Sequence, residues 1–315
     1  MTPNKIKAKT YRYVLLPSAL LVIFASSLFF SSCSGPEKET APEPEKLEYK
    51  ADREEESPGL EQDLEQPAKS EPENNCNYMG ISDDPQLPRV GLYGGKGSWS
   101  ENVEITGKFL DYYGFEWSLF DENEAVDLNL EDHYDLLWFP GGFAAEYKNF
   151  ISDHSNIRDF VKEGGLFVGS CAGAYYASAV LRWQGTDYEY PLKLFAGKGV
   201  GPLSGLIGWG ETGLIELKEN HPANSNFDHE KEMYYFDGPY FEPEDGEAVT
   251  VLARYHVNDE PAVISGEKGA GKYLLLGPHP EIGGYSEQSP QFDPEGKNGG
   301  QWPWLHQVLV WFSQP

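Results

Sequence analysis

The chain has 315 residues, with 51 acidic and 24 basic side chains and a formal net charge of −27. This charge argues against nucleic acid as a partner, because phosphate binding requires a basic surface. The length allows one large domain or two small ones, and three cysteines are too few for a disulfide framework.

Residues 1–33 resemble the signal peptide of a bacterial lipoprotein. A run of basic side chains precedes an uncharged apolar stretch at residues 13–30, and small residues then lead directly to Cys33. The resemblance implies lipidation of Cys33, although Phe30 stands where such signals usually have Leu. The alternative is an uncleaved transmembrane anchor, since the apolar stretch could just span a bilayer. In either case we expect the rest of the chain to lie outside the cytoplasm, tethered to a membrane of the bacterial cell envelope.

Residues 34–80 have the composition of a disordered acidic linker. Pro, Glu and Lys dominate, and large apolar side chains are nearly absent. Such a segment buries too little surface to offset the entropy cost of ordering it. We therefore expect an extended spacer, followed by one folded domain over residues 81–315. The sequence does not decide whether the thiol of Cys76, near the end of this spacer, is paired.

In the first part of the folded domain, predicted strands alternate with predicted helices. This pattern indicates an α/β fold with a doubly wound, mostly parallel sheet. The predicted elements are strands at residues 89–95, 116–121, 135–139 and from 166 onward, and helices at 98–113 and 156–162. Ligands of such sheets bind at the carboxyl ends of the strands.

The second part of the domain has a different pattern. Short apolar runs alternate with Gly and aromatic residues over residues 181–218 and 232–241, which predicts a β-rich insertion over the edge of the sheet. The remaining predicted elements are strands at residues 249–255, 261–265 and 271–277 and a helix at 303–312.

The stretch from Leu166 to Ala179 has the pattern of a nucleophile elbow, in which a strand, a tight turn and a helix follow one another. The apolar strand leads into Gly169-Ser170-Cys171-Ala172-Gly173, and residues compatible with a helix follow. Small residues on both flanks permit the tight turn, and a helix that begins directly after Cys171 favours the thiolate. The alternative is an inert, buried cysteine between a core strand and a helix.

A cysteine nucleophile needs a base and a third group that orients the base. His279 is the histidine that directly follows a strongly apolar strand, and Glu281 stands two residues further on. Cys171, His279 and Glu281 are therefore the candidate catalytic residues. The residues around His221 and His229 match no trusted ligand spacing, so we expect neither a metal nor a cofactor.

These three residues, with the motif around each, resemble the Cys-His-Glu triad of the class I glutamine amidotransferase superfamily. The resemblance implies a flavodoxin-like sheet and the roles of nucleophile, base and orienting acid, in that order. A Gly-rich loop supplies part of the oxyanion hole in the superfamily, which assigns that role to Gly141 and Gly142 after Pro140. The backbone N–H of Ala172, just after the nucleophile, would supply the rest.

A closer resemblance is to the N-terminal domain of eukaryotic-type biotin–protein ligases. The matching segments agree in order and spacing, and they are residues 139–142, 169–175, 194–197, 199–202, 235–238, 261–263 and 277–281. Asp237 departs from the pattern, because the family has Asn there. The sequence has no Gly-Arg-Gly-Arg-type loop to hold biotinyl-adenylate, so we expect no biotin ligase catalytic domain.

These features together predict a membrane-tethered, extracytoplasmic hydrolase. Cys171 would attack an amide or peptide-like bond of a small-molecule or peptide-like substrate. Tyr175, Asp237 and Tyr240 are the candidate substrate-binding residues, with Phe241 beside them. The alternative is a catalytically inactive lipoprotein of the same fold that binds a ligand or a partner.

Overall fold

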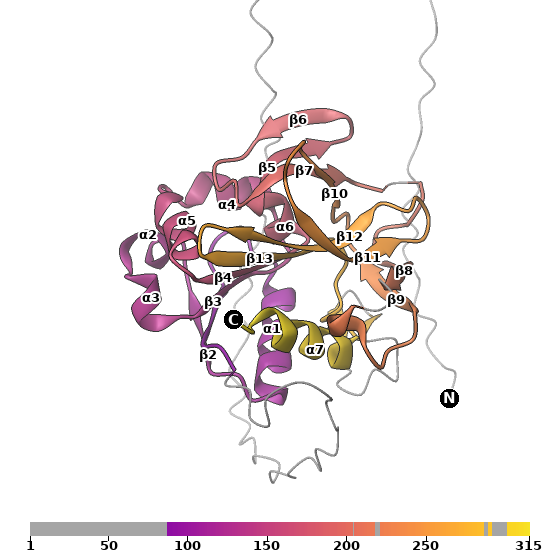
Figure 1. Ribbon diagram of the computed structural model, residues 1–315, viewed down its shortest axis with the longest axis horizontal. Coiled ribbons are helices and arrows are strands. Elements are labelled where there is room, and N and C mark those ends of the chain that lie inside the picture. Colours follow the sequence, from indigo (N-terminus) through magenta and orange to yellow (C-terminus); the bar gives the residue numbers. More distant parts are fainter. Residues whose placement is uncertain (1–86, 204, 218–220, 287–288, 292–300) are drawn as a thin grey trace, which may run out of the picture. The chain divides into compact units, whose positions relative to one another are not determined.

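The part of the chain that the structure describes contains a sheet of nine strands (Figure 1). The computed structural model describes residues 87–203, 205–217, 221–286, 289–291 and 301–315. The expected signal peptide with Cys33 and the expected spacer with Cys76 lie outside the described residues. Within the described ranges, no helix is both long and apolar enough to cross a bilayer.

The strand order of the main sheet is β2-β1-β3-β4-β13-β12-β11-β8-β9. The first five strands of this order are parallel to one another, and the other four continue the sheet in antiparallel pairs. The bounds are β1 Val90–Tyr93, β2 Trp117–Phe120, β3 Leu136–Phe139, β4 Leu166–Ser170, β8 Glu211–Leu217, β9 Glu230–Tyr235, β11 Val249–Tyr255, β12 Pro261–Lys268 and β13 Gly271–Leu276.

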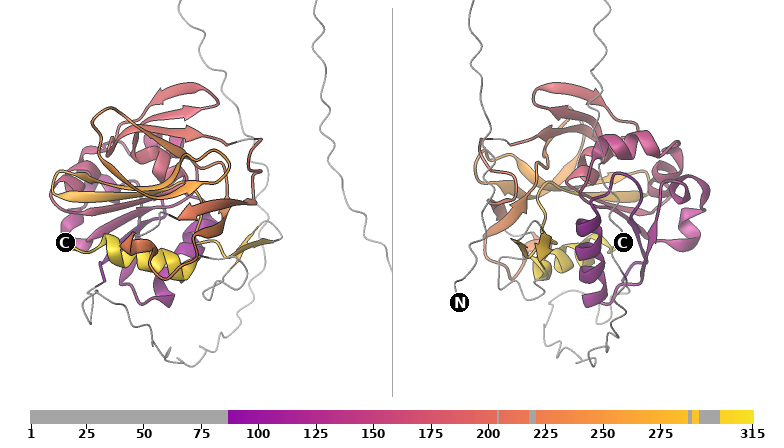
Figure 2. Two further views of the ribbon diagram at one scale, coloured as in Figure 1. Left: turned by 45° about the vertical axis from the view of Figure 1, so that its right-hand side comes forward. Right: turned by 180° about the vertical axis from the view of Figure 1, so that it is seen from behind.

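Helices cover both faces of the parallel strands, because alternate side chains of each strand point to opposite faces and both sets are apolar. In β3, Leu136 and Trp138 pack with α1 and α7, whereas Leu137 and Phe139 pack with α2 to α6 (Figures 1 and 2). The bounds are α1 Ser100–Tyr112, α2 Glu124–Asp127, α3 Leu130–His133, α4 Ala144–Phe150, α5 Ser155–Lys162, α6 Ala172–Ala177 and α7 Trp302–Phe312.

A second sheet, in the order β10-β7-β5-β6, forms the expected β-rich insertion and lies at the top of Figure 1. The strands β5 and β7 are parallel, and the two outer pairings are antiparallel. The bounds are β5 Ser178–Trp183, β6 Thr186–Glu189, β7 Phe195–Gly201 and β10 Tyr240–Pro243, with a separate hairpin of β14 Gly284–Ser286 and β15 Ser289–Gln291.

The structure confirms the expected α/β fold class, with a mostly parallel centre and additional antiparallel strands. One expectation is wrong in detail, because β8 and β9 lie in the main sheet and not in the insertion. In β8, Ile215 and Leu217 point into the core that α1 and α7 share, so burial of these side chains holds the strand in the main sheet. The helix α4, directly after the Gly-rich turn, was not expected.

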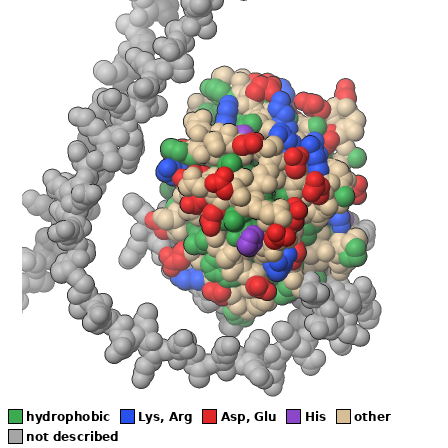
Figure 3. Space-filling model, turned by 90° about the vertical axis from the view of Figure 1, so that its left-hand side faces the viewer, with side chains coloured by type: hydrophobic (Ala, Val, Ile, Leu, Met, Phe, Trp, Pro, Cys, Tyr) green, Lys and Arg blue, Asp and Glu red, His purple; other side chains and the backbone are tan. Residues whose placement is uncertain are grey.

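The outer face on the side of α2 and α3 carries acidic and basic side chains in close alternation (Figure 3). Exposed ion pairs occur among the described residues, such as Arg89 with Asp135 at 2.9 Å and Lys162 with Asp159 at 3.3 Å. Each such pair contributes little to stability, because solvent and salt screen it. The charge of this face therefore affects solubility more than fold.

Candidate active site

Cys171 lies in the turn between β4 and α6, at the carboxyl end of a central parallel strand. Its backbone has φ +49° and ψ −102°, a conformation that residues other than glycine rarely adopt. A Cβ on Gly173 would overlap the carbonyl oxygen of Phe139, and a Cβ on Gly169 would lie 2.6 Å from Gly173. Both flanking positions must therefore be glycine, in agreement with the tight turn expected from the sequence.

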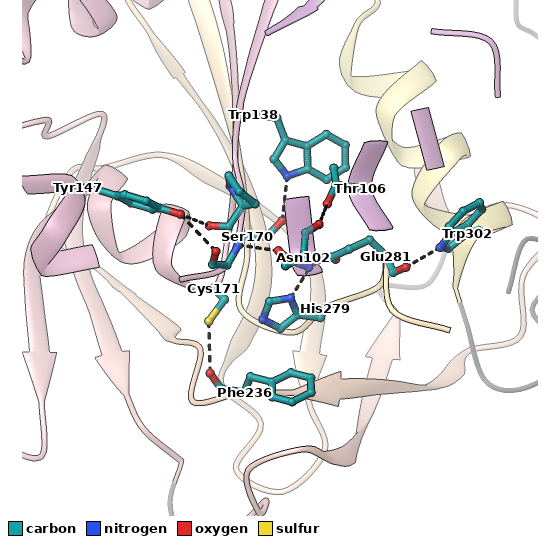
Figure 4. A network of polar contacts seen from close by, with 12 residues as sticks. Asn102, Thr106, Trp138, Tyr147, Ser170, Cys171, Phe236, His279, Glu281 and Trp302 are labelled. Carbon is teal, nitrogen blue, oxygen red and sulfur yellow. Dashed lines mark hydrogen bonds and ion pairs between the residues drawn. The ribbon is translucent and has the colours of Figure 1, made fainter. Parts of the chain in front are cut away.

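His279 and Glu281 follow β13, the strand that pairs in parallel with β4. The carboxyl ends of the two strands meet at one edge of the sheet, so the segment after β13 lies beside the elbow. Backbone bonds hold both segments there, from Cys171 N–H to Leu276 O at 2.8 Å and from His279 N–H to Tyr234 O at 2.9 Å. The structure thus brings together the three residues proposed as a triad (Figure 4).

The imidazole of His279 and the carboxylate of Glu281 form a fully buried pair, with Nδ1 and Oε1 2.7 Å apart. Burial by itself lowers the pKa of His279, but the Glu281 carboxylate and the Cys171 sulfur outweigh it and raise this pKa. Because a carboxylate only accepts hydrogen bonds, Nδ1 carries the proton in this pair. Nε2 has no hydrogen-bond partner among the described residues and is the nitrogen left for a proton transfer.

The thiol of Cys171 is 6% exposed and donates to the carbonyl oxygen of Phe236 over 3.3 Å. Figure 4 shows the sulfur beside the ring of His279, with the Phe236 carbonyl below it. The position of this carbonyl therefore decides where the thiol points.

Aromatic rings enclose the imidazole. The ring of Phe236 meets that of His279 edge to face with centroids 5.3 Å apart, and the ring of Trp99 does so at 6.1 Å. A Cβ on Gly141 would lie 2.6 Å from Cε1 of His279, so the Gly-rich turn also touches the ring. This enclosure keeps water away, which strengthens the effect of the Glu281 charge.

Two of the three residues expected in the oxyanion hole have a backbone N–H that the described part of the chain leaves unused. The N–H groups of Gly142 and Ala172 donate to no acceptor among the described residues. The N–H of Gly141 is engaged, because it donates to Oδ1 of Asn102 over 2.7 Å. Gly142 has φ +154°, and a Cβ there would overlap the carbonyl oxygen of Gly97, so this turn also requires glycine.

Residues 236–239, which we call the carbonyl loop, accept four side-chain hydrogen bonds on four consecutive carbonyl groups. The first is the bond from Cys171. The donors to the next three carbonyls are the hydroxyls of Tyr175, Tyr235 and Tyr255, at 2.9, 2.9 and 3.2 Å. Since a buried carbonyl without a partner is costly, these tyrosines fix the loop and, through it, the acceptor of the thiol.

Tyr175 and Asp237 were expected to bind substrate, and the structure gives them different surroundings. Tyr175 is 3% exposed and donates to the Asp237 carbonyl, so it supports the carbonyl loop. Asp237 is partly exposed, has φ +60°, and its carboxylate has no hydrogen-bond partner in the described part of the chain. Partial burial raises the pKa of this carboxyl group.

Tyr240 and Phe241 lie on β10 in the second sheet. Tyr240 is partly buried, and its hydroxyl bonds Glu242 at 3.2 Å. Phe241 is fully buried and packs edge to face with Phe195 at 5.9 Å. Phe241 is therefore a core residue and not the pocket residue we expected.

Asn102 on α1 belongs to the site, although the sequence reasoning did not single it out. It is fully buried and donates from Nδ2 to Oε1 of Glu281 over 2.8 Å. A signal was present in the sequence, because Asn102 and Thr106 stand at helical spacing with Ile105 and Phe109 on the buried face of α1. A polar residue on such an apolar face needs an explanation.

In the described ranges, no group of three or more His, Cys, Asp or Glu side chains could hold a metal ion. His221, which belongs to the cluster considered above, accepts a bond from the N–H of Ala223 over 3.2 Å and caps a short 3₁₀ helix. This contact accounts for His221 as a structural residue.

A cysteine at a strand–helix elbow, with a histidine and a glutamate beyond the next parallel strand, places the domain in the glutamine amidotransferase-like class of α/β proteins. Residues 130–298 match the family model described as "Biotin-protein ligase, N terminal", which is more than half of the chain. The chain belongs to this family.

Two curated proteins illustrate the relationship. The chain is 31% identical over 178 residues to "Biotin--protein ligase" of Schizosaccharomyces pombe, which covers 50% of this chain and 27% of that protein. It is 30% identical over 165 residues to an "Uncharacterized protein" of Chlamydia muridarum, which covers 48% of this chain and 62% of that protein. The matches thus span about a quarter and about three fifths of these relatives.

Solved structures described as glutamine amidotransferases are also similar. One has a TM-score of 0.47 and 18% identity, and the similarity covers 70% of this chain and 98% of that chain. Another, from Thermotoga maritima, has a TM-score of 0.44 and 17% identity, covering 61% and 76%.

Proposed function

We propose that this domain is a cysteine amidohydrolase whose nucleophile is Cys171. The observation that carries the proposal is the buried His279–Glu281 pair beside the elbow, in which Nε2 of His279 has no hydrogen-bond partner among the described residues. A buried base with one nitrogen anchored and the other unused is the arrangement that proton transfer to and from a nucleophile requires.

The nucleophilic form is a Cys171 thiolate beside a protonated His279, which arises when the thiol proton passes to Nε2, and the raised pKa of His279 favours this form. The sulfur of the thiolate then attacks the amide carbonyl carbon. The tetrahedral oxyanion accepts bonds from the N–H groups of Gly142 and Ala172. His279 then donates the proton to the amine, the C–N bond breaks, and a thioester remains. A water molecule that loses its proton to His279 attacks this thioester, which releases a carboxylic acid and restores the thiol.

Before the first step the thiol must turn away from the Phe236 carbonyl. This change requires rotation about one side-chain bond of Cys171. Hydrogen bonds between catalytic groups are often poorly aligned before substrate binds. The same contact also favours a second candidate function, an inactive protein that uses the pocket only to bind a ligand or partner. If the domain is the proposed hydrolase, its substrate is a small-molecule or peptide-like amide.

We further propose that the protein is an envelope lipoprotein that Cys33 attaches to the membrane through a lipid. The apolar stretch followed by small residues and Cys33 supports this, and the acidic spacer would separate the domain from the bilayer. The domain would then act on substrates outside the cytoplasm.

Thiol labelling of the full chain with iodoacetamide near neutral pH tests the catalytic proposal. We expect Cys171 to react much faster than Cys76 in the same sample, and His279→Ala to slow Cys171 alone. His133→Ala is the matched control, since this histidine is exposed. Equal, slow rates at both cysteines, with no effect of His279→Ala, would support the binding protein instead.

A further inference from the structure

We infer that Asn102 is a positioning residue that joins the triad carboxylate to the oxyanion turn through a single side chain. This inference rests on the proposed function, because it assigns a role within the same site. Asn102 is fully buried on α1 and lies between Glu281 and the Gly-rich turn (Figure 4).

The orientation of the Asn102 amide is determined by its two partners. On one side, the backbone N–H of Gly141 can only donate, so it faces Oδ1 at 2.7 Å. On the other side, the carboxylate of Glu281 can only accept, so it faces Nδ2 at 2.8 Å. Exchange of the amide O and N would break both bonds.

The first consequence concerns Glu281. Its Oε1 accepts one bond from Nδ1 of His279 and another from Nδ2 of Asn102, whereas Oε2 has no partner among the described residues. Asn102 is thus the second of two side-chain donors to that oxygen in the described part of the chain. Without it, the direction in which the carboxylate meets His279 would depend on one bond.

The second consequence concerns the turn. The first turn of α1 binds both polar backbone groups of Gly141, because Asn102 accepts its N–H and the N–H of Trp99 donates to its carbonyl at 2.9 Å. The hydroxyl of Tyr147 is shared between the carbonyl of Pro140, at 3.1 Å, and that of Gly141, at 3.3 Å. With Gly141 held in this way, the N–H of Gly142 is the next donor of the turn, and no acceptor in the described ranges occupies it, so it can donate to an oxyanion.

The alternative is that Asn102 is only a buried polar residue whose hydrogen bonds are made, with no role in positioning the site. The two views differ in what the surrounding groups do when Asn102 changes. Substitution of a positioning residue changes the environment of the His279 proton and of the Gly141 amide together. Substitution of a purely structural residue changes only the stability of the fold.

The test compares the full chain with Asn102→Leu and Asn102→Asp, with Thr106→Val as the matched control. Thr106 is equally buried on α1, and its hydroxyl bonds only the Asn102 carbonyl among the described contacts. Leu removes both side-chain bonds, whereas Asp keeps an acceptor for Gly141 and sets a second buried carboxyl group against Glu281. The two carboxyl groups share one proton at low pH, and the donor to Glu281 is lost once the pH is high enough to remove that proton. The readouts are the ¹H and ¹⁵N resonances of the His279 Nδ1–H and of the Gly141 amide, together with the pH profile of Cys171 alkylation.

In Asn102→Leu we expect both resonances to shift and the Gly141 amide to exchange about tenfold faster, as the loss of its hydrogen bond to Asn102 predicts. In Asn102→Asp the Gly141 resonance should stay and the His279 resonance and the alkylation profile should move. Thr106→Val should leave all of them unchanged. If Asn102→Leu does not fold, Asn102→Asp carries the test.

The inference is overturned if folded Asn102→Leu leaves the His279 resonance in place, if Asn102→Asp leaves it in place at every pH, or if Thr106→Val produces the same shifts. Slow alkylation of wild-type Cys171 that ignores His279→Ala would instead overturn the proposed function. The resonances report on the contacts in either case, so the two failures are distinguishable.

Discussion

The sulfur of Cys171 donates to the carbonyl oxygen of Phe236, 3.3 Å away, while Nε2 of His279 beside it has no partner among the described residues. The acceptor of the thiol belongs to the carbonyl loop, and three tyrosine hydroxyls hold that loop in place. Substitution of these tyrosines should therefore change the reactivity of the Cys171 thiol without altering any of the three triad residues.

Tyr175→Phe should destabilise the domain and change the reactivity of Cys171. The substitution leaves the partly buried Asp237 carbonyl without its donor, which costs about 1 kcal/mol. Urea unfolding measures the loss, and iodoacetamide labelling measures the change in alkylation rate. Tyr188→Phe is the control, because this tyrosine is 49% exposed, and equal effects of both substitutions would contradict the assignment.

Gly173→Ala should prevent the elbow from forming. The new Cβ would overlap the Phe139 carbonyl, which is backbone and cannot move aside as a side chain can. We expect a loss of at least about 3 kcal/mol, the upper range for overpacking. Gly94→Ala is the comparison, since its Cβ would meet only the exposed side chain of Leu119 at 3.0 Å. Similar denaturation midpoints for the two variants would refute the close approach.

Glu281→Gln should lower the pKa of His279 and flatten the pH dependence of stability. The folded protein holds this pKa at about 10, above its ordinary value of about 6.5. Protonated His279 therefore stabilises the fold fully below about pH 6.5, and the contribution is lost as the pH rises through about 10.

We expect the free energy of unfolding of the wild type to fall between about pH 7 and 9.5 and that of Glu281→Gln to change less. Urea titrations at several pH values measure both slopes. His306 acts in a different window, because burial lowers its pKa to about 4 and its stabilisation is lost as the pH falls from about 6.5. Identical slopes above pH 7 would show that Glu281 does not control His279.

Cys33→Ala should release the protein from the membrane fraction of a bacterial host. Mass spectrometry of the wild type should show a mature chain that begins with diacylglycerol-modified Cys33. If the apolar stretch is instead a transmembrane anchor, Cys33→Ala stays in the membrane fraction and the chain keeps residues before position 33. Fractionation and intact mass thus decide between the two readings.

The sequence was sufficient to predict the parallel strands, the elbow and the proximity of His279 to it. These predictions depend on local patterns, because an apolar run that ends in a turn residue places that residue at the carboxyl edge of a parallel sheet. The motifs around Cys171 and His279 then identified the family. Such patterns also predicted the insertion, since Gly and aromatic residues alternate there.

What the sequence did not predict depends on contacts between distant segments. Tyr175 looked like a pocket residue, and only the position of the carbonyl loop shows that its hydroxyl is already used. The sequence pattern of β8 indicated part of the insertion. Its pairing with β11 joins segments that are distant in the chain, and a local pattern does not predict such a pairing. Asn102 could be recognised as an unusual residue on an apolar helix face, but the spacing of residues alone does not identify its hydrogen-bond partners.

The hydrogen bond between Asn102 and Glu281 joins residues 179 positions apart in the chain. Contacts between such distant segments form slowly during folding, because the entropy of closing the intervening loop is lost before the contacts compensate for it. The site therefore cannot exist in a nascent chain that ends before β13, however well its first strands have folded. Fast labelling of Cys171 would consequently serve as a kinetic marker for the last parallel strand joining the sheet.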